Sequence, residues 1–417
     1  MDPFARWVAE HAAPLRGVDP DGDLDDLEPL RGVVGDARVV GIGEGAHCVG
    51  EFAALRRRML RFLSERCGFA AVAVEFGFAE AEPLDRWVRG VDDEHTGPRG
   101  TSASGVTWEF ARWLREHNTG SRPLRLLGLD VPVAGGSLRP ALEPVLELLE
   151  RVDAELVPLA QRALALSDRI ASRSGAAAGP RWGELDTADQ DALTASLSRL
   201  RLRMRALQPH YLASSDQHSY DRALHCLEAA CHADYMFGAT RDLFAGGSLA
   251  GDTTVRELYL AESLRWHLDR LPAGTRTALV AHNNHLQRTP LRLGGQLLTL
   301  PLGLHLQRVL GDDYRAIALT HTAEHVPEMH PHRRDDLGYD VVDTALPEPG
   351  SGSVEAGLVA AGLGATPSAL DLRRARQELP AGQLPQRMRS QSELLELPVA
   401  EDFDGLLATP SVTVLEE

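Results

Sequence analysis

Titratable side chains occur at the ends of four short apolar segments of the sequence. They are Glu44 with His47, Glu75, Asp130, and His282 with His285. An imidazole titrates near neutral pH, so it can take a proton from water and later return it to a leaving group. A neighbouring carboxylate fixes the tautomer of that imidazole and stabilises its charged form. These residue types therefore indicate general acid–base chemistry.

The segments that precede these residues are typical of buried strands. They are apolar almost throughout, as expected for strands covered on both faces. The four segments are 37–43, 70–75, 124–129 and 276–281, and a fifth apolar segment of the same kind follows at 314–320. Helical patterns at 50–66 and 107–117 separate the first three segments, so the sequence predicts an α/β fold with a mostly parallel central sheet flanked by helices. Such sheets bind ligands beyond the carboxyl ends of their strands, which favours one shared pocket for the titratable groups.

The middle of the chain has a different pattern. From about residue 137 to residue 272 the apolar residues recur at helical spacing, and we find no strand pattern there. We therefore expect residues 1–136 and 273–417 to form the two parts of the α/β core, and 137–272 to form an inserted helical lobe over its carboxyl edge. The patterns also predict a loop at 172–183 and a last strand near 411–415.

Composition excludes several function classes. Acidic residues number 60 against 43 basic ones, for a formal charge of −17, so nucleic acid and anionic membranes are poor partners. All the basic residues are arginine, which excludes a lysine Schiff base and a P-loop lysine. The N-terminus does not read as a signal peptide, no apolar run is long enough to cross a membrane, and four cysteines do not make a disulfide framework. We expect a cytoplasmic protein; the sequence leaves its oligomeric state open.

The motifs resemble those of the erythromycin esterase family, in the same order along nearly the whole chain. The opening motif consists of Gly43, Glu44, His47, Glu51, Phe52, Arg56 and Glu75. Later matches are WLREHN at 113–118, GLD at 128–130, RELYLAESLRW at 256–266, AHNNH at 281–285 and PLGLHLQRVLGDDYRAIALT at 301–320. Together these motifs are specific, although no single one is.

The resemblance implies roles for individual residues. His47 is expected to be the general base that activates water, and Glu44 and Glu75 to position water and imidazole. Arg56 supports the charge, and His282 and His285 complete the site, His285 either in direct contact with substrate or behind the residues that are. We expect Asp130, Cys48 and Phe76, which adjoin these groups, to contact substrate. The family more often has Thr or Ser before the His and Gly after it, where this chain has Ala46 and Cys48, so erythromycin is not the expected substrate.

Other motifs are absent or weak. The sequence has neither a G-x-S-x-G nucleophile elbow nor an H-E-x-x-H zinc motif. The histidines of HCLEAACH at 225–232 are expected on a packed helix, and those of HTAEHVPEMHPH at 321–332 in a polar loop at the rim of the pocket. Zinc binding is the alternative for both. We predict neither a metal nor a cofactor.

The leading prediction is hydrolysis of an ester or lactone of a sizeable, largely apolar small molecule, such as a bacterial natural product. Two alternatives stay open. The same acid–base groups could drive elimination, cyclisation or acyl transfer in specialised metabolism. The protein could also be a non-catalytic binder of a small molecule or haem, although binding alone does not require Glu44, His47 and Glu75 together.

Overall fold

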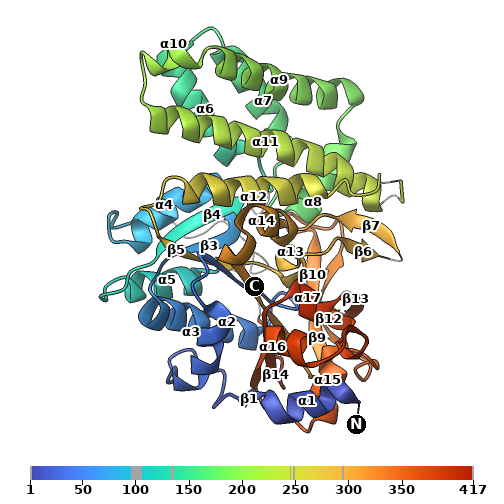
Figure 1. The fold of residues 1–417 in the computed structure, drawn as a ribbon. Coiled ribbons are helices and arrows are strands. Elements are labelled where there is room, and N and C mark those ends of the chain that lie inside the picture. The colour runs from blue at the N-terminus through green and yellow to red at the C-terminus, as the bar shows by residue number, and fades with distance from the viewer. Residues whose placement is uncertain are drawn as a thin grey trace.

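The computed structural model describes residues 2–94, 106–132, 136–244, 246–247, 249–293 and 295–415. Within these ranges the central sheet has eight strands. In chain order they are β1 (Ala13–Pro14), β2 (Val39–Ile42), β3 (Phe69–Gly77), β4 (Arg125–Asp130), β5 (Arg276–Val280), β8 (Tyr314–His321), β11 (Ser368–Asp371) and β14 (Gly405–Thr409). They pair in the order β1-β11-β14-β8-β2-β5-β3-β4 (Figure 1).

Neighbouring strands from β14 to β4 run parallel, and β11 and β1 add an antiparallel edge. The predicted fold class is therefore confirmed, and each of the five predicted strands is present within two residues of its expected bounds. The predicted strand at 411–415 is wrong. The last strand is β14, which is buried throughout, whereas 411–415 forms only an isolated bridge from Val414 to Val49.

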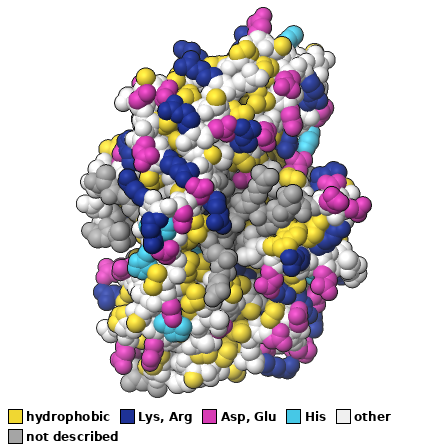
Figure 2. All heavy atoms as spheres, turned by 180° about the vertical axis from the view of Figure 1, so that it is seen from behind, with side chains coloured by type: hydrophobic (Ala, Val, Ile, Leu, Met, Phe, Trp, Pro, Cys, Tyr) yellow, Lys and Arg dark blue, Asp and Glu magenta, His cyan; other side chains and the backbone are white. Residues whose placement is uncertain are grey.

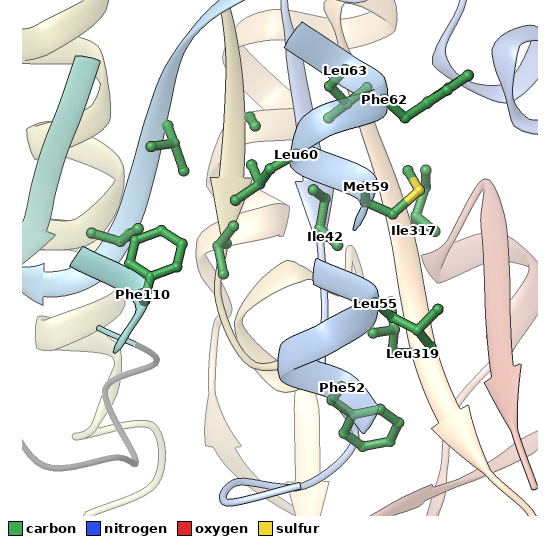
Figure 3. Close-up of a cluster of buried hydrophobic side chains, with 14 of the residues drawn as sticks. Ile42, Phe52, Leu55, Met59, Leu60, Phe62, Leu63, Phe110, Ile317 and Leu319 are labelled. Carbon is green, nitrogen blue, oxygen red and sulfur yellow. The ribbon is translucent and has the colours of Figure 1, made fainter. Parts of the chain in front are cut away.

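Helix α3 (Gly50–Cys67) covers one face of the sheet. Its apolar side chains recur at helical spacing, so Phe52, Leu55 and Met59 turn toward the strand residues Ile42, Ile317 and Leu319 (Figure 3). The helix ends at Gly68, whose left-handed backbone (φ +77°) suits glycine. Because the apolar stripe fixes the rotation of α3, it also fixes where Arg56 points.

Helices α6 to α11 form the lobe, with their own core of buried side chains, set apart from the sheet (Figure 1). The helices of this region are α6 (Arg139–Val152), α7 (Val157–Asp168), α8 (Gly175–Glu184), α9 (Thr187–Ala206), α10 (Gln208–Leu212), α11 (Gln217–Phe244) and α12 (Thr254–Leu268). Helix α12 joins the two parts, because Tyr259 packs in the lobe core while Leu260 and Leu264 pack against the sheet. The predicted loop at 172–183 is wrong: Ser174 caps helix α8 there.

The last third of the chain supplies smaller elements around the sheet. Two hairpins concern the site, β9 (His325–Pro331) with β10 (Tyr339–Ala345) and β12 (Arg387–Ser390) with β13 (Glu393–Glu396). The polar loop predicted at 321–332 is therefore largely strand β9, because its backbone pairs with β10. Helix α4 (Phe78–Val88) follows β3, α13 (Asn283–Leu286) follows β5, and α14 (Leu302–Leu310) precedes β8.

Acidic and basic side chains are interspersed over the face seen in Figure 2. This distribution is unlike the one-sided basic field of a nucleic-acid-binding surface. Across the described ranges, no helix combines the length and the apolar character that crossing a bilayer requires.

Candidate active site

The loops after β2 and β5 carry most of the predicted residues, and Asn283 ties the two loops together. The backbone N–H of Asn283 donates to the carbonyl oxygen of Glu44 over 2.9 Å, and its side-chain Nδ2 donates to the carbonyl oxygen of Leu319 over 2.8 Å. This packing requires a glycine at position 43, because a Cβ atom there would lie 1.8 Å from Oδ1 of Asn283. The sequence motif therefore has a steric reason as well as a chemical one.

Glu44 lies between His47 and Arg56. Its Oε1 atom is 2.8 Å from Nδ1 of His47, and its Oε2 atom accepts a hydrogen bond of 2.5 Å from Nη1 of Arg56. Arg56 is buried and also donates to the carbonyl oxygens of Gly43 and Ala281, so it is held at three points. A carboxylate on Nδ1 places the proton there and leaves Nε2 of His47 to accept another. The His47 side chain keeps 15% of its exposure, so solvent reaches the ring.

His282 contributes a different kind of group. Its Nδ1 accepts a hydrogen bond of 3.1 Å from the backbone N–H of Asn284, and its ring centroid lies 4.9 Å from that of His47. Burial, together with the neighbouring His47 and His285, holds the pKa of His282 well below its usual value, so the ring is neutral. The proton of the neutral ring then sits on Nε2, which is buried and has no hydrogen-bond partner among the described residues.

His285 lies between two carboxylates. Its Nε2 is 3.2 Å from Oε1 of Glu75, and its Nδ1 is 2.7 Å from Oε1 of Glu257. Burial would lower the pKa of His285, but the charges of Glu257 and Glu75 raise it to about 10. Burial would likewise raise the pKa of Glu75, but His285 and Arg256 hold it well below its usual value. The two carboxylates thus favour the charged form of His285 over the neutral form that a general base requires.

The carboxylate of Asp130 binds the side chain of Arg256. Nε of Arg256 lies 3.0 Å from Oδ1 of Asp130, and Nη2 donates both to Oδ2 of Asp130 over 2.5 Å and to Oε1 of Glu75 over 2.8 Å. With 2% of its surface exposed, Asp130 is an orienting group for Arg256. The strand ends of β3 and β4 are therefore bridged by an arginine from α12.

Cys48 and Phe76 are both buried. Cys48 has a left-handed backbone (φ +59°) and is 4% exposed. Phe76 is 1% exposed and packs in the core between α3 and the sheet, because successive strand residues point to opposite faces and Glu75 points the other way. The buried positions of these side chains therefore do not favour direct contact of Asp130, Cys48 or Phe76 with substrate.

The other histidine clusters lie in different environments. His225 packs against Tyr259 and Trp266 in the lobe, where burial lowers its pKa to about 3. His321 is buried at the end of β8, and burial lowers its pKa to about 3. Within the described part of the chain, no group of three or more His, Cys, Asp or Glu side chains is arranged to hold a metal ion.

Sequence reasoning missed four residues of this arrangement: Arg256, Glu257, Asn284 and Gln391. The first two begin the motif RELYLAESLRW, but nothing in the helical pattern of α12 distinguishes Glu257 from Glu262, the other acid of that helix. Asn284 acts through its backbone. Gln391 lies in the β12–β13 turn, and its Oε1 accepts a hydrogen bond of 2.7 Å from the backbone N–H of His47.

Known proteins resemble this chain over nearly its full length. Erythromycin esterase type II of Escherichia coli is 31% identical over 99% of both chains. Erythromycin esterase type I of Escherichia coli is 34% identical over 93% of this chain and 94% of its own.

Solved structures agree with these matches. A histidine-to-asparagine mutant of the erythromycin esterase EreC, in its open conformation, superposes with a TM-score of 0.86 at 29% identity, covering 96% of this chain and 97% of that one. A Bacillus cereus protein shares the fold with a TM-score of 0.75 at 18% identity, covering 99% of this chain and 98% of its own. The family model for erythromycin esterase matches residues 64–412. The chain therefore belongs to the erythromycin esterase family and has the esterase character of that family.

Proposed function

We propose that this enzyme hydrolyses an ester or lactone of a small natural product, with His47 as the general base. The observation that carries the proposal is the contact between Nδ1 of His47 and the Glu44 carboxylate, itself held by Arg56. That pair leaves Nε2 of His47 ready to accept a proton, and the His47 side chain keeps 15% of its exposure.

In the first step a water oxygen attacks the carbonyl carbon of the ester. The water proton passes to Nε2 of His47, and Glu44 stabilises the imidazolium that forms. The carbonyl oxygen becomes an oxyanion. It would accept a hydrogen bond from Nε2–H of His282, which has no protein partner among the described residues.

In the second step the tetrahedral intermediate collapses. The bond between the carbonyl carbon and the alkoxy oxygen breaks, and the imidazolium of His47 gives its proton to the leaving alkoxide. An ester yields an acid and an alcohol, and a lactone yields one hydroxy acid. His285 keeps its positive charge throughout, because its pKa is about 10, and it offsets the charges of Glu75 and Glu257.

The test is a library of esters and lactones of natural-product type, incubated with the protein and read by mass spectrometry for a gain of one water. His47→Ala should lower kcat by about 10²- to 10⁴-fold. His330→Ala is a matched control, because His330 is an exposed histidine on β9. A His47 variant that keeps more than about a tenth of the wild-type kcat would remove His47 from the mechanism.

Other products would point to other reactions. A product isomeric with its substrate would favour cyclisation, and one lighter by water would favour elimination. A haem absorption band in the purified protein, with no turnover of any ester, would favour a binding protein.

A further inference from the structure

The β12–β13 turn contacts the loop of His47 at two points, although it lies 344 residues further along the chain. Oε1 of Gln391 accepts a hydrogen bond of 2.7 Å from the backbone N–H of His47. The backbone N–H of Gln391 in turn donates to the carbonyl oxygen of Gly45 over 2.7 Å. These bonds hold both sides of the segment from which the imidazole projects.

The backbone of Gln391 itself is in the left-handed region, with φ +52°. Glycine adopts this conformation at lower cost than any residue with a side chain. Strained positions of this kind persist where surrounding interactions hold them, and they occur at functional sites. The side chain of Gln391 thus provides an interaction that glycine could not.

Glu328 on β9 orients the Gln391 amide. Its Oε1 lies 3.5 Å from Nε2 of Gln391, and its Oε2 accepts a hydrogen bond of 2.9 Å from the backbone N–H of Ser392. A carboxylate only accepts, so the NH₂ of the amide faces Glu328 and the amide oxygen faces the His47 N–H. The Gln391 amide group therefore has a partner at each end, and the two partners fix its orientation.

The residue before the turn, Ser390 at the end of β12, contacts the loop of His282. Oγ of Ser390 donates to Oδ1 of Asn284 over 3.1 Å, and the backbone N–H of Asn284 donates to Nδ1 of His282. Two consecutive residues, the last of β12 and the first of the turn, thus contact the loops of His282 and His47.

We propose that Gln391 is a positioning residue for the reaction. Its amide holds the His47 loop so that Nδ1 stays on Glu44 and Nε2 faces the attacking water. The kinetic part of this inference rests on the proposed function, whereas the effect on His47 itself does not depend on a known substrate.

The variants are Gln391→Ala and Gln391→Gly, with Glu393→Ala as the matched control. Glu393 is an exposed neighbour in the same hairpin. The glycine variant relieves the left-handed backbone, so it keeps the turn even if the alanine variant loses stability. Circular dichroism and the melting temperature establish that each variant is folded.

The first measurement is hydrogen exchange of the His47 backbone amide in the free protein. Both Gln391 variants should exchange it about 10-fold faster or more, because that N–H loses its acceptor, and Glu393→Ala should not. The Gln391→Glu variant keeps an acceptor oxygen for the His47 amide. At acid pH its carboxyl group is neutral beside Glu328, so the His47 amide of this variant should exchange slowly again. Folded variants with wild-type exchange at His47 would overturn the proposal.

The second measurement is the kinetics on the substrate found in the library screen. We expect kcat to fall about 10- to 100-fold with KM changed less than about twofold, as for a displaced catalytic group. The acidic limb of the pH profile of kcat/KM should also move, which a general loss of stability would not cause. Faster exchange with unchanged kcat and pH profile would overturn the positioning role. A screen that finds no substrate would count against the proposed function, and the exchange result would still decide whether Gln391 holds His47.

Discussion

Nδ1 of His282 accepts its hydrogen bond from the backbone N–H of Asn284, 3.1 Å away, so no substitution at position 284 other than proline removes the donor. The backbone therefore sets the tautomer of His282, and the His282 ring centroid lies 4.9 Å from that of His47. A fixed, buried donor of this kind is suited to an oxyanion, because no solvent has to reorganise when charge develops.

The first prediction concerns this donor. His282→Leu should lower kcat by about 10²- to 10³-fold with a small change in KM, because the interaction forms only in the transition state. His282→Gln retains an N–H donor and should lose less. Steady-state kinetics of both variants provide the measurement. Equal losses in the two variants would mean that His282 acts by filling space.

The second prediction concerns stability at alkaline pH. The pKa of His285 is raised from an ordinary value of 6.5 to about 10 by Glu257 and Glu75, against the effect of burial. Between these values the folded protein binds more protons than the unfolded chain, so the stabilisation is complete below about pH 6.5 and is lost as pH rises to about 10. The free energy of unfolding should therefore fall over that window.

Urea unfolding across this pH range measures the effect, with His285→Gln for comparison. The variant cannot bind a proton at that position, so its unfolding free energy should be lower at neutral pH and should depend less on pH. A wild-type protein whose stability falls no more steeply than that of the variant would show that His285 does not carry the charge.

How much of this site could be predicted depended on where each residue lies. The rule that parallel sheets bind ligands at the carboxyl ends of their strands located Glu44, Glu75, Asp130 and His282, because such strands are buried on both faces and read as apolar runs. The same proximity underlies the prediction that Phe76 contacts substrate. It follows Glu75 directly, but the two-residue period of a strand turns it into the core.

Residues that reach the site from outside the strand ends could not be located this way. Glu257 and Arg256 come from α12, where only the packing of the lobe on the sheet selects which acid faces His285. Gln391 comes from a two-residue turn whose position depends on contacts with β9 and with the His47 loop. No local periodicity encodes such long-range contacts.

The third prediction is that a chelator leaves activity unchanged. Several of the atoms that a metal would need already have partners: Nδ1 of His47 contacts Glu44, Glu44 binds Arg56, and both nitrogens of His285 face carboxylates. An arginine among the ligands would also repel a cation. Dialysis against EDTA followed by assay is the measurement. Loss of activity with recovery on adding zinc or manganese would contradict this prediction.

The fourth prediction concerns the substrate and starts from the two residues beside His47. Ala46 is fully buried, and Cys48 is 4% exposed in a left-handed backbone conformation. A hydroxyl at position 46 would need a buried hydrogen-bond partner, and a glycine at position 48 would relieve the backbone. The residues on both sides of His47 therefore differ from the Thr- or Ser-containing and Gly-containing pattern expected of the family.

Small displacements of a catalytic group change which substrates are processed well, because discrimination depends on contacts in the transition state. Glu44, His47 and Arg56 are linked as acid–base chemistry requires, so we expect the same chemistry on a molecule other than erythromycin. The measurement is kcat/KM on erythromycin, with an erythromycin esterase assayed in parallel. We expect a value below about 10⁴ M⁻¹ s⁻¹, the lower end for well-matched enzymes and substrates. Ala46→Ser combined with Cys48→Gly should raise it. A wild-type value above that range would make erythromycin, or a related macrolide, the simpler choice of substrate.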